Sequence, residues 1–244
     1  MSLLPGERVD VLASRHIKII QSGAVFSFSL DAVLLANFAQ IKRHSRVGDL
    51  AAGNGAVGLF LARKTDNRVT MVELQPRLAD MARRSVALNA LANVDVHEGD
   101  LADTTKFVAK DSVDVVTCNP PYFKISARSI TNPNDHLAIA RHELTTDFAT
   151  VARVSADLLK YQGKAYFVHR PDRLAELLAT LTAVGLAPKQ LQFIHPREDR
   201  EANMVLIAAI KAGRPDGLRI MPPLIVHEAD GGYTPFVRRL LHGD

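Results

Sequence analysis

What the sequence has little of limits the kinds of protein it can be. With a single cysteine, Cys118, the 244-residue chain can form neither an intrachain disulfide framework nor a cysteine-based zinc cluster. It has no apolar run of the roughly 18 residues that a membrane-spanning helix needs. Residues 1–10 lack the charged start, apolar stretch and cleavage pattern of a signal peptide. We therefore expect a cytoplasmic protein that does not enter a membrane.

Metal-binding and repetitive patterns are missing as well. No two of the nine histidines have the i, i+4 spacing, with an acidic partner, that zinc proteases use, so we expect no metal. There is no internal repeat, low-complexity tract or long Gly/Ser linker. Hydrophobic residues make up 47% and charged residues 23% of the chain, which are the proportions of a folded globular protein.

The chain carries a modest excess of positive charge, formally +4 at pH 7. Residues 1–48 hold six Lys or Arg against three acidic residues, whereas the last 48 residues hold seven of each. A polyanionic partner is one interpretation, and the mildly basic character of many enzymes is the other. If the protein has a surface for a polyanion, the N-terminal segment is the better place to look for it.

From residue 46 onward, strand-like segments alternate with helix-like ones. This spacing predicts an α/β fold with a doubly wound, mainly parallel seven-stranded sheet, whose ligands bind at the carboxyl ends of the strands. The strands are predicted at residues 47–51, 68–73, 94–98, 113–118, 164–169, 190–195 and 204–211. Helices are predicted from the glycine-rich turn at 53–58 to residue 64, and at 76–91, 148–159 and 173–185, with a strand at 16–20 and a helix at 29–40 before them.

Two segments do not follow this alternation. Residues 122–142 form a long stretch of the kind that is functional or disordered inside a compact domain. Residues 222–241 show no clear period, and their Gly231-Gly232 pair predicts a turn.

A glycine-rich turn follows the first strand of the alternating series. Gly53, Gly55 and Gly58 spell GxGxxG, the dinucleotide-binding pattern. The stretch that begins at Asp49 also resembles the nucleotide-binding loop of class I S-adenosylmethionine (AdoMet)-dependent methyltransferases, from which Ala51 departs where that loop has its first glycine. The Asp49 carboxylate, at the strand end, would repel the pyrophosphate of a dinucleotide but would attract the ammonium group of an amino-acid ligand such as AdoMet. A purely structural strand-to-helix turn is the remaining interpretation.

Acidic residues follow the next two strands. Glu73 ends the second strand, where its carboxylate could accept hydrogen bonds from both hydroxyls of a ribose, and Asp100 follows the third strand, where it could accept from an adenine amino group. Either residue alone is more often a solvated carboxylate at a loop end. Their positions after successive strands favour a nucleoside ligand.

The tetrapeptide Asn119-Pro120-Pro121-Tyr122 directly follows the fourth strand and is the most specific feature of the sequence. Both prolines have a fixed φ and no N–H, so the segment leaves the sheet as a stiff turn with unpaired carbonyls. The Asn119 side chain and the Pro120 carbonyl could together accept both hydrogens of one planar NH2 group. Tyr122 offers a face on which a flat base can stack.

This arrangement suits one chemical problem. The lone pair of an exocyclic amine is delocalised into its ring, and two acceptors that favour a more tetrahedral nitrogen make it available to an electrophilic methyl group on sulfonium. A hydride-transfer enzyme has no use for such a group. We therefore interpret Asn119, Pro120 and Tyr122 as catalytic residues.

These motifs together resemble the amino-group N-methyltransferases of the class I AdoMet-dependent superfamily. Residues 26–36, the run Ala140-Arg141-His142-Glu143 and the C-terminal Gly232-Tyr233-Thr234 extend the likeness over most of the chain, toward the bacterial tRNA1(Val) (adenine37-N6)-methyltransferase family in particular. The resemblance implies a seven-stranded sheet with its last strand antiparallel, AdoMet as the methyl donor and N6-methyladenosine in tRNA as the product. RNA is accordingly the expected partner.

The resemblance also implies a division of the chain and a set of site residues. Residues 1–45 would be an N-terminal segment that helps close the cofactor site, and residues 46–244 would form the methyltransferase domain as a single compact unit. The residues implied in cofactor binding are Phe28, Asp31, Asp49, Ala51, Gly53, Gly55, Glu73, Asp100 and Asn119. The candidates for substrate contact are Pro121, Lys124, Arg128 and His142, and His142 has a helix-capping role as its alternative.

The residues leave the substrate open. A glutamine side-chain amide in a protein, or guanine N2 in rRNA, presents the same two donors as adenine N6, so the tetrapeptide does not separate them. A small-molecule methyltransferase and a nucleic-acid-binding module with a vestigial methyltransferase fold are further alternatives. The departure at Ala51 permits the vestigial interpretation, whereas the intact Asp49, Glu73, Asp100 and Asn119 argue against it.

Overall fold

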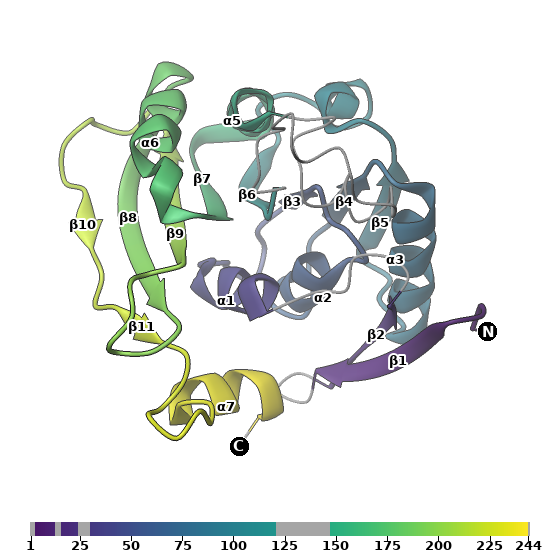
Figure 1. Ribbon diagram of the computed structural model, residues 1–244. Coiled ribbons are helices and arrows are strands. Elements are labelled where there is room, and N and C mark those ends of the chain that lie inside the picture. Colours follow the sequence, from purple (N-terminus) through teal and green to yellow (C-terminus); the bar gives the residue numbers. More distant parts are fainter. Residues whose placement is uncertain (1–2, 13–15, 24–29, 121–146, 244) are drawn as a thin grey trace, which may run out of the picture.

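A mixed β-sheet lies at the centre of the computed structural model, which describes residues 3–12, 16–23, 30–120 and 147–243 (Figure 1). Seven long strands run in the order β8-β9-β7-β6-β3-β4-β5, and two strands of two residues each, β10 and β11, pair with β8. The long strands are β3 (Val47–Leu50), β4 (Val69–Glu73), β5 (Val94–Glu98), β6 (Val113–Cys118), β7 (Leu159–His169), β8 (Leu186–His195) and β9 (Met204–Lys211). The short ones are β10 (Arg219–Ile220) and β11 (Leu224–Ile225).

The strand directions confirm the expected topology. β9, the last of the seven long strands, is antiparallel to β7 and β8, and the other neighbouring pairs in this sheet are parallel. The mainly parallel seven-stranded core was predicted correctly, whereas β10 and β11 were not. Because each is only two residues long and pairs only with β8, neither carries a period that the sequence could show.

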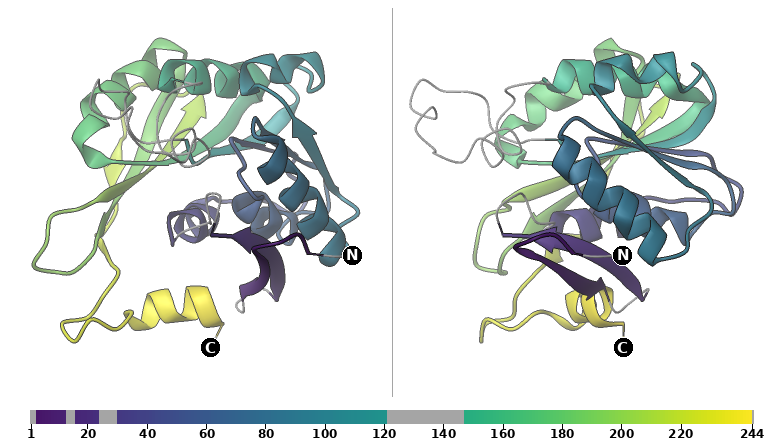
Figure 2. Two further views of the ribbon diagram at one scale, coloured as in Figure 1. Left: turned by 45° about the vertical axis from the view of Figure 1, so that its right-hand side comes forward. Right: turned by 90° about the vertical axis from the view of Figure 1, so that its right-hand side faces the viewer.

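Helices cover both faces of the sheet, so its strands bury side chains on both sides. Val115 and Tyr166 belong to the core on the face that carries α1, α2 and α3, and the adjacent Val116 and Phe167 belong to the core on the other face. On the first face lie α1 (Leu30–Phe38), α2 (Ala56–Ala62) and α3 (Pro76–Leu88). On the second lie the short 3-10 helix η2 (Leu101–Lys106), α5 (Phe148–Leu158) and α6 (Leu174–Ala183), with the single turn η3 (Pro171–Arg173) before α6 (Figure 2).

An antiparallel hairpin, β1 (Glu7–Leu12) and β2 (Ile17–Ser22), precedes the sheet and packs against α3. The sequence predicted the second of these strands but not the first. Side chains of α3 hydrogen-bond the backbone of β2. Asn89 accepts from the Lys18 N–H at 2.9 Å and donates to the Lys18 carbonyl at 2.6 Å, and the Ser85 hydroxyl accepts from the Ile20 N–H at 3.0 Å.

A buried ion pair also fixes this hairpin to α3. The Arg84 guanidinium donates to both oxygens of the Glu7 carboxylate, at 2.6 and 2.7 Å. The hydrogen bond from Arg84 lowers the pKa of Glu7. The Glu7 side chain is fully buried, so removing Arg84 would leave a buried carboxylate without its ion-pair partner. Arg84 itself also pairs with Asp80, at 2.7 Å.

The C-terminal segment, for which the sequence showed no period, contains a helix. α7 (Pro235–His242) begins with a proline at its first position, and its Val237 is fully buried in the core beside α1. Figures 1 and 2 show α7 on the same side of the sheet as α1 and the hairpin. The predicted turn at Gly231 is present, with φ +88° at that glycine. Among the described residues, no helix is long and apolar enough to cross a bilayer.

Candidate cofactor and substrate site

The carboxyl ends of three neighbouring strands bring the main sequence motifs together. In the parallel register, Leu50 of β3 lies opposite Val72 of β4 and Cys118 of β6. The residues that follow each of them, Ala51, Glu73 and Asn119, therefore lie side by side at one edge of the sheet. β4 and β6 lie on either side of β3, so the glycine-rich turn after β3 lies between Glu73 and Asn119.

The turn after β3 relies on left-handed backbone conformations. Gly53 and Gly55 have φ values of +59° and +90°, which glycine adopts without a steric penalty. Ala51 also takes a left-handed conformation, with φ +51°. In a residue with a Cβ this conformation costs about 1 kcal/mol. Ala51 thus adopts the left-handed backbone conformation that a glycine would adopt at this position, but at a cost in strain energy.

The glycines of the turn have two different surroundings. Among the described residues, a Cβ at Gly53 would have no heavy atom within 4 Å. A Cβ at Gly58 would approach the Met71 side chain to 2.4 Å, and one at Gly55 would meet Met71 and Ala82 at 3.2 Å. Gly55 and Gly58 therefore allow α2 and the turn to pack closely on β4 and α3. The described residues leave open space beside Gly53, where a ligand can approach the backbone.

Asp49 stabilises the glycine-rich turn through hydrogen bonds of its buried carboxylate. Its carboxylate is 1% exposed and accepts hydrogen bonds from the Gly58 N–H at 2.9 Å and from the Thr117 hydroxyl at 2.8 Å. Burial raises the pKa of Asp49 to about 7, against the lowering effect of these two bonds. Both oxygens of the Asp49 carboxylate thus accept hydrogen bonds from within the protein, and these bonds connect β3 to α2 and to β6.

Glu73 lies across the same turn. It is 5% exposed, and its two oxygens accept from the Gly53 N–H and the Gln75 N–H, each at 2.8 Å. Burial raises the pKa of Glu73, while these backbone N–H groups oppose the shift. Each carboxylate oxygen has a second lone pair. The geometry therefore leaves acceptor capacity beside the open space at Gly53.

Further predicted residues lie within the described structure. Asp100 follows β5 and caps η2, where its carboxylate accepts from the Ala102 N–H at 2.8 Å. Asn119 is partly buried and Pro120 is buried, directly after β6. Asp31 is buried in the first turn of α1, and its carboxylate accepts from the Ala32 N–H at 2.9 Å.

Sequence reasoning missed Asn54, which lies between the glycines of the turn. Its side chain is 2% exposed and its amide donates to the Ile20 carbonyl of β2 at 3.0 Å. The turn is therefore attached to the N-terminal hairpin. The sequence carries no signal for this bond, because its partners are 34 residues apart and one of them is a backbone atom.

Six residues predicted to take part in catalysis or binding lie outside the described residues: Phe28, Pro121, Tyr122, Lys124, Arg128 and His142. Among the described residues, no three His, Cys, Asp or Glu side chains gather where they could hold a metal ion. Cys118 is fully buried, and burial raises the pKa of its thiol.

The fold and the turn together define a class of protein. A sheet with a core of seven long strands and an antiparallel β9, a glycine turn after β3 and an acidic residue at the end of β4 are the features of a class I AdoMet-dependent methyltransferase. The residues present fit AdoMet, because among the described residues Gly53 leaves space for a ligand beside the Glu73 carboxylate, which has acceptor capacity left.

Comparison with known proteins agrees with this class. The chain belongs to the methyltransferase small domain family, whose model matches residues 16–172. It is 30% identical over 178 residues to a tRNA1(Val) (adenine(37)-N6)-methyltransferase from Phocaeicola vulgatus, covering 73% of this chain and 74% of that one. It is 26% identical over 221 residues to a protein of the same name from Shewanella sp. strain MR-4, covering 90% and 91%.

Solved structures share the fold. A predicted O-methyltransferase, protein Atu636 from Agrobacterium tumefaciens, is 28% identical with a TM-score of 0.68, covering 87% of this chain and 96% of that one. The P. horikoshii protein TYW2, solved in complex with MeSAdo, is 16% identical with a TM-score of 0.61, covering 85% and 72%. The likeness to TYW2 concerns the fold alone.

Proposed function

We propose that this methyltransferase transfers the methyl group of AdoMet to the exocyclic N6 of an adenine in tRNA. The observation that carries the proposal is the position of Asn119 and Pro120, immediately after β6 and beside the glycine turn. The relatives from Phocaeicola and Shewanella, which bear the name of a tRNA adenine-N6 methyltransferase, support the same substrate.

The glycine turn and the two acidic residues beyond it would hold the cofactor. Glu73 accepts from the ribose hydroxyls with its remaining lone pairs, and Asp100 accepts from the adenine amino group. Gly53 allows close approach of the ligand to the backbone. Asp49, whose oxygens already accept from Gly58 and Thr117, acts by fixing the shape of the turn.

The N-terminal segment, residues 1–45, would close this site over the methyltransferase domain of residues 46–244. The bond from Asn54 to Ile20 supports the assignment, since it fixes the end of β2 against the glycine turn. Asp31 and Phe28, which follow β2 in the chain, would then face the cofactor from this segment.

Bound AdoMet supplies an electrophilic methyl group on its sulfonium. The protein's part is to bind the target NH2 group in a reactive orientation. The Asn119 side-chain carbonyl and the Pro120 main-chain carbonyl accept its two hydrogens, which favours a tetrahedral nitrogen and frees the lone pair. Tyr122 stacks on the base, and Pro121, Lys124, Arg128 and His142 contribute substrate contacts.

Two acceptors at this point favour an amino group over a hydroxyl group, since a hydroxyl has only one hydrogen to donate. A tRNA loop suits such a site, because a base that is already partly unstacked costs little to extrude. The positive charge of the N-terminal segment also favours a polyanionic substrate over a protein side chain.

A methylation assay with competing substrates tests the proposal. Purified protein and labelled AdoMet are supplied with an unmodified tRNA1(Val) transcript, the same transcript with guanine in place of adenine 37, and a bulk protein extract. We expect labelled N6-methyladenosine in the first transcript only. The Asn119→Ala variant, purified identically, controls for contaminating activity.

The other outcomes contradict the proposal in different ways. Label in protein would assign the enzyme to amide methylation, and label in the guanine-37 transcript would move the target nucleotide. Absence of label in all three would refute nucleic-acid methylation by this chain.

A further inference from the structure

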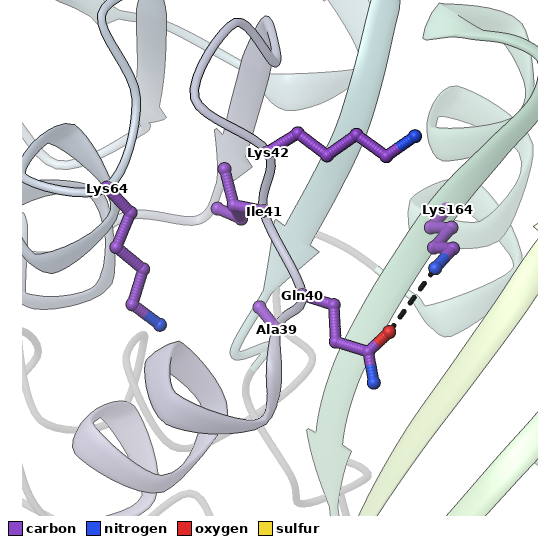
Figure 3. Close-up of a pocket in the computed structure, with 6 residues that line it drawn as sticks. All are labelled: Ala39, Gln40, Ile41, Lys42, Lys64 and Lys164. Carbon is purple, nitrogen blue, oxygen red and sulfur yellow. Dashed lines mark hydrogen bonds between the residues drawn. The ribbon is translucent and has the colours of Figure 1, made fainter.

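A second feature of the molecule lies at the other end of α1 from Asp31. A pocket of about 400 Å³ opens there, and it is lined by three lysines, one glutamine and two apolar residues (Figure 3). None of the described residues that line it has a carboxylate. The residues are Ala39, Gln40, Ile41, Lys42, Lys64 and Lys164.

Three separate parts of the chain supply these lysines. Lys42 follows α1, Lys64 follows α2, and Lys164 lies in β7. The C-termini of two helices therefore lie near the pocket, and a cation is favoured there by the helix dipole. α1 is nine residues long, so the pocket lies roughly 13 Å along that helix from its cofactor end.

Structural roles account for part of this charge. The Lys64 ammonium donates to the Ala36 carbonyl in the last turn of α1 at 2.5 Å, which satisfies a helix end. Lys164 makes a long contact of 3.4 Å with the Gln40 side-chain oxygen, which carries no charge (Figure 3). Within the described part of the chain, neither Lys42 nor Lys164 forms an ion pair.

Two carboxylates that contact residues shortly after Lys42 are already engaged. Asp66 pairs with Arg43, and Asp114 pairs with Lys160 at 2.9 Å while also accepting from the Arg46 N–H at 2.7 Å. Among the described residues, the charges of Lys42 and Lys164 are therefore uncompensated. Lys42 belongs to the N-terminal excess of basic residues, and the fold brings Lys164 beside it.

We propose that this pocket binds a phosphate group, and that the phosphate belongs to the backbone of the RNA substrate. A lysine ammonium is a compact point charge on a flexible stem, and such groups bind phosphate without a fixed geometry. The inference rests on the proposed function, because a structured RNA at the catalytic end of α1 is what would bring backbone phosphates to its other end.

A double variant, Lys42→Gln with Lys164→Gln, tests the pocket and leaves Lys64 to cap α1. The matched control is Lys106→Gln with Lys110→Gln. It removes the same charge from the other face of the sheet, where these lysines pair with Asp103 and Asp157. Affinity for the unmodified tRNA transcript is measured over a series of salt concentrations, and AdoMet affinity is measured by calorimetry.

We expect the pocket variant to bind the transcript about tenfold more weakly at low salt, with a salt slope shallower by about one for each phosphate that it no longer neutralises. Its AdoMet affinity and kcat should match those of the wild type, and KM for the transcript should rise. The control variant should retain the wild-type transcript affinity and slope.

The effect of inorganic phosphate on Tm tests the pocket without RNA. If phosphate raises the Tm of the wild type and not of the pocket variant, while both bind the transcript equally, the pocket holds a small phosphorylated molecule and the RNA assignment is overturned. If neither transcript affinity nor the response to phosphate differs between wild type and pocket variant, Lys42 and Lys164 form no phosphate site and the proposal fails. If the wild type neither binds nor methylates tRNA, the proposed function is refuted. The Tm measurement with inorganic phosphate then shows by itself whether the pocket binds phosphate.

Discussion

The side-chain amide of Asn54 donates a 3.0 Å hydrogen bond to the backbone carbonyl of Ile20, so the glycine turn and the N-terminal hairpin are directly joined. The hairpin is in turn held on α3 by the two bonds between Asn89 and the Lys18 backbone. Displacement of the hairpin would therefore disturb the turn that we assign to the cofactor. By linkage, AdoMet and the docked hairpin should stabilise each other.

The first prediction concerns this connection. Asn54→Ala leaves the buried Ile20 carbonyl without its partner, which should cost about 1–3 kcal/mol of the free energy of unfolding. It should also weaken AdoMet binding. Asn89→Ala loosens the hairpin at a distance from the turn, and it should weaken AdoMet binding to a smaller extent. Denaturant unfolding and calorimetric titration measure the two effects.

The control for this pair is Asn67→Ala, which removes a 3.0 Å bond from a side-chain amide to the His44 carbonyl away from the glycine turn. It should leave AdoMet affinity unchanged. If Asn89→Ala also left that affinity unchanged, the hairpin would not support the cofactor turn, and Asn54 would act only locally.

The second prediction concerns Ala51. Ala51→Gly removes the strain of a left-handed conformation at φ +51° and should raise the free energy of unfolding by about 0.5–1 kcal/mol. Ala90 has the same φ of +51° just after α3, which makes Ala90→Gly a matched control with a similar gain in stability. AdoMet binding should tighten only in Ala51→Gly, because only that methyl group borders the cofactor turn. Equal AdoMet affinities in both variants would remove Ala51 from the site.

The third prediction concerns the dependence of stability on pH. Burial raises the pKa of Asp49 to about 7 from an ordinary value of 3.8, so the folded protein binds a proton that the unfolded chain releases. The resulting stabilisation is complete below about pH 4 and is lost as the pH rises through about 7. Relative to Asp49→Asn, the wild type should therefore lose stability over this range. Urea unfolding at a series of pH values measures the difference.

Thr117→Val sharpens this test, since it keeps the carboxylate and removes a hydroxyl that lowers the pKa of Asp49. Its loss of stability should extend to higher pH than in the wild type. A flat difference between wild type and Asp49→Asn from about pH 4 to 8 would show that Asp49 titrates normally.

The fourth prediction separates catalysis from cofactor binding. Asn119→Ala removes one of the two acceptors for the target NH2 group and should lower kcat by at least about 100-fold. AdoMet affinity should stay within a few-fold of the wild type, because Glu73 and the glycine turn remain. Single-turnover methylation and calorimetry measure the two quantities. Loss of AdoMet binding in this variant would contradict the catalytic role of Asn119.

Sequence patterns predicted the regular part of the fold well, for a physical reason. Strands of a parallel sheet covered on both faces are short, apolar and evenly separated by helices, so β3, β4, β5 and β6 are visible in the sequence itself. β1 was missed because its charged and apolar residues are ordered by docking on α3, through pairs such as Glu7 and Arg84. α7 was missed because it has only eight residues, and its single fully buried side chain is Val237.

The same distinction applies to the site. Asp49, Glu73 and Asn119 could be predicted because each lies at the end of a strand, and the carboxyl ends of neighbouring parallel strands meet. The sequence could not show that both oxygens of Asp49 are used by Gly58 and Thr117, since Thr117 lies 68 residues further along the chain.

The sequence by itself determined the class of chemistry, through local motifs whose backbone constraints do not depend on distant residues: a glycine turn, two acidic strand ends and an asparagine before two prolines. Only the tertiary structure decided how the turn is held and where positive charge collects. The bond from Asn54 to Ile20 and the pocket of Lys42, Lys64 and Lys164 join segments far apart in the chain. Such contacts exist only after the hairpin, α1 and β7 have packed, because no local pattern encodes which surfaces meet.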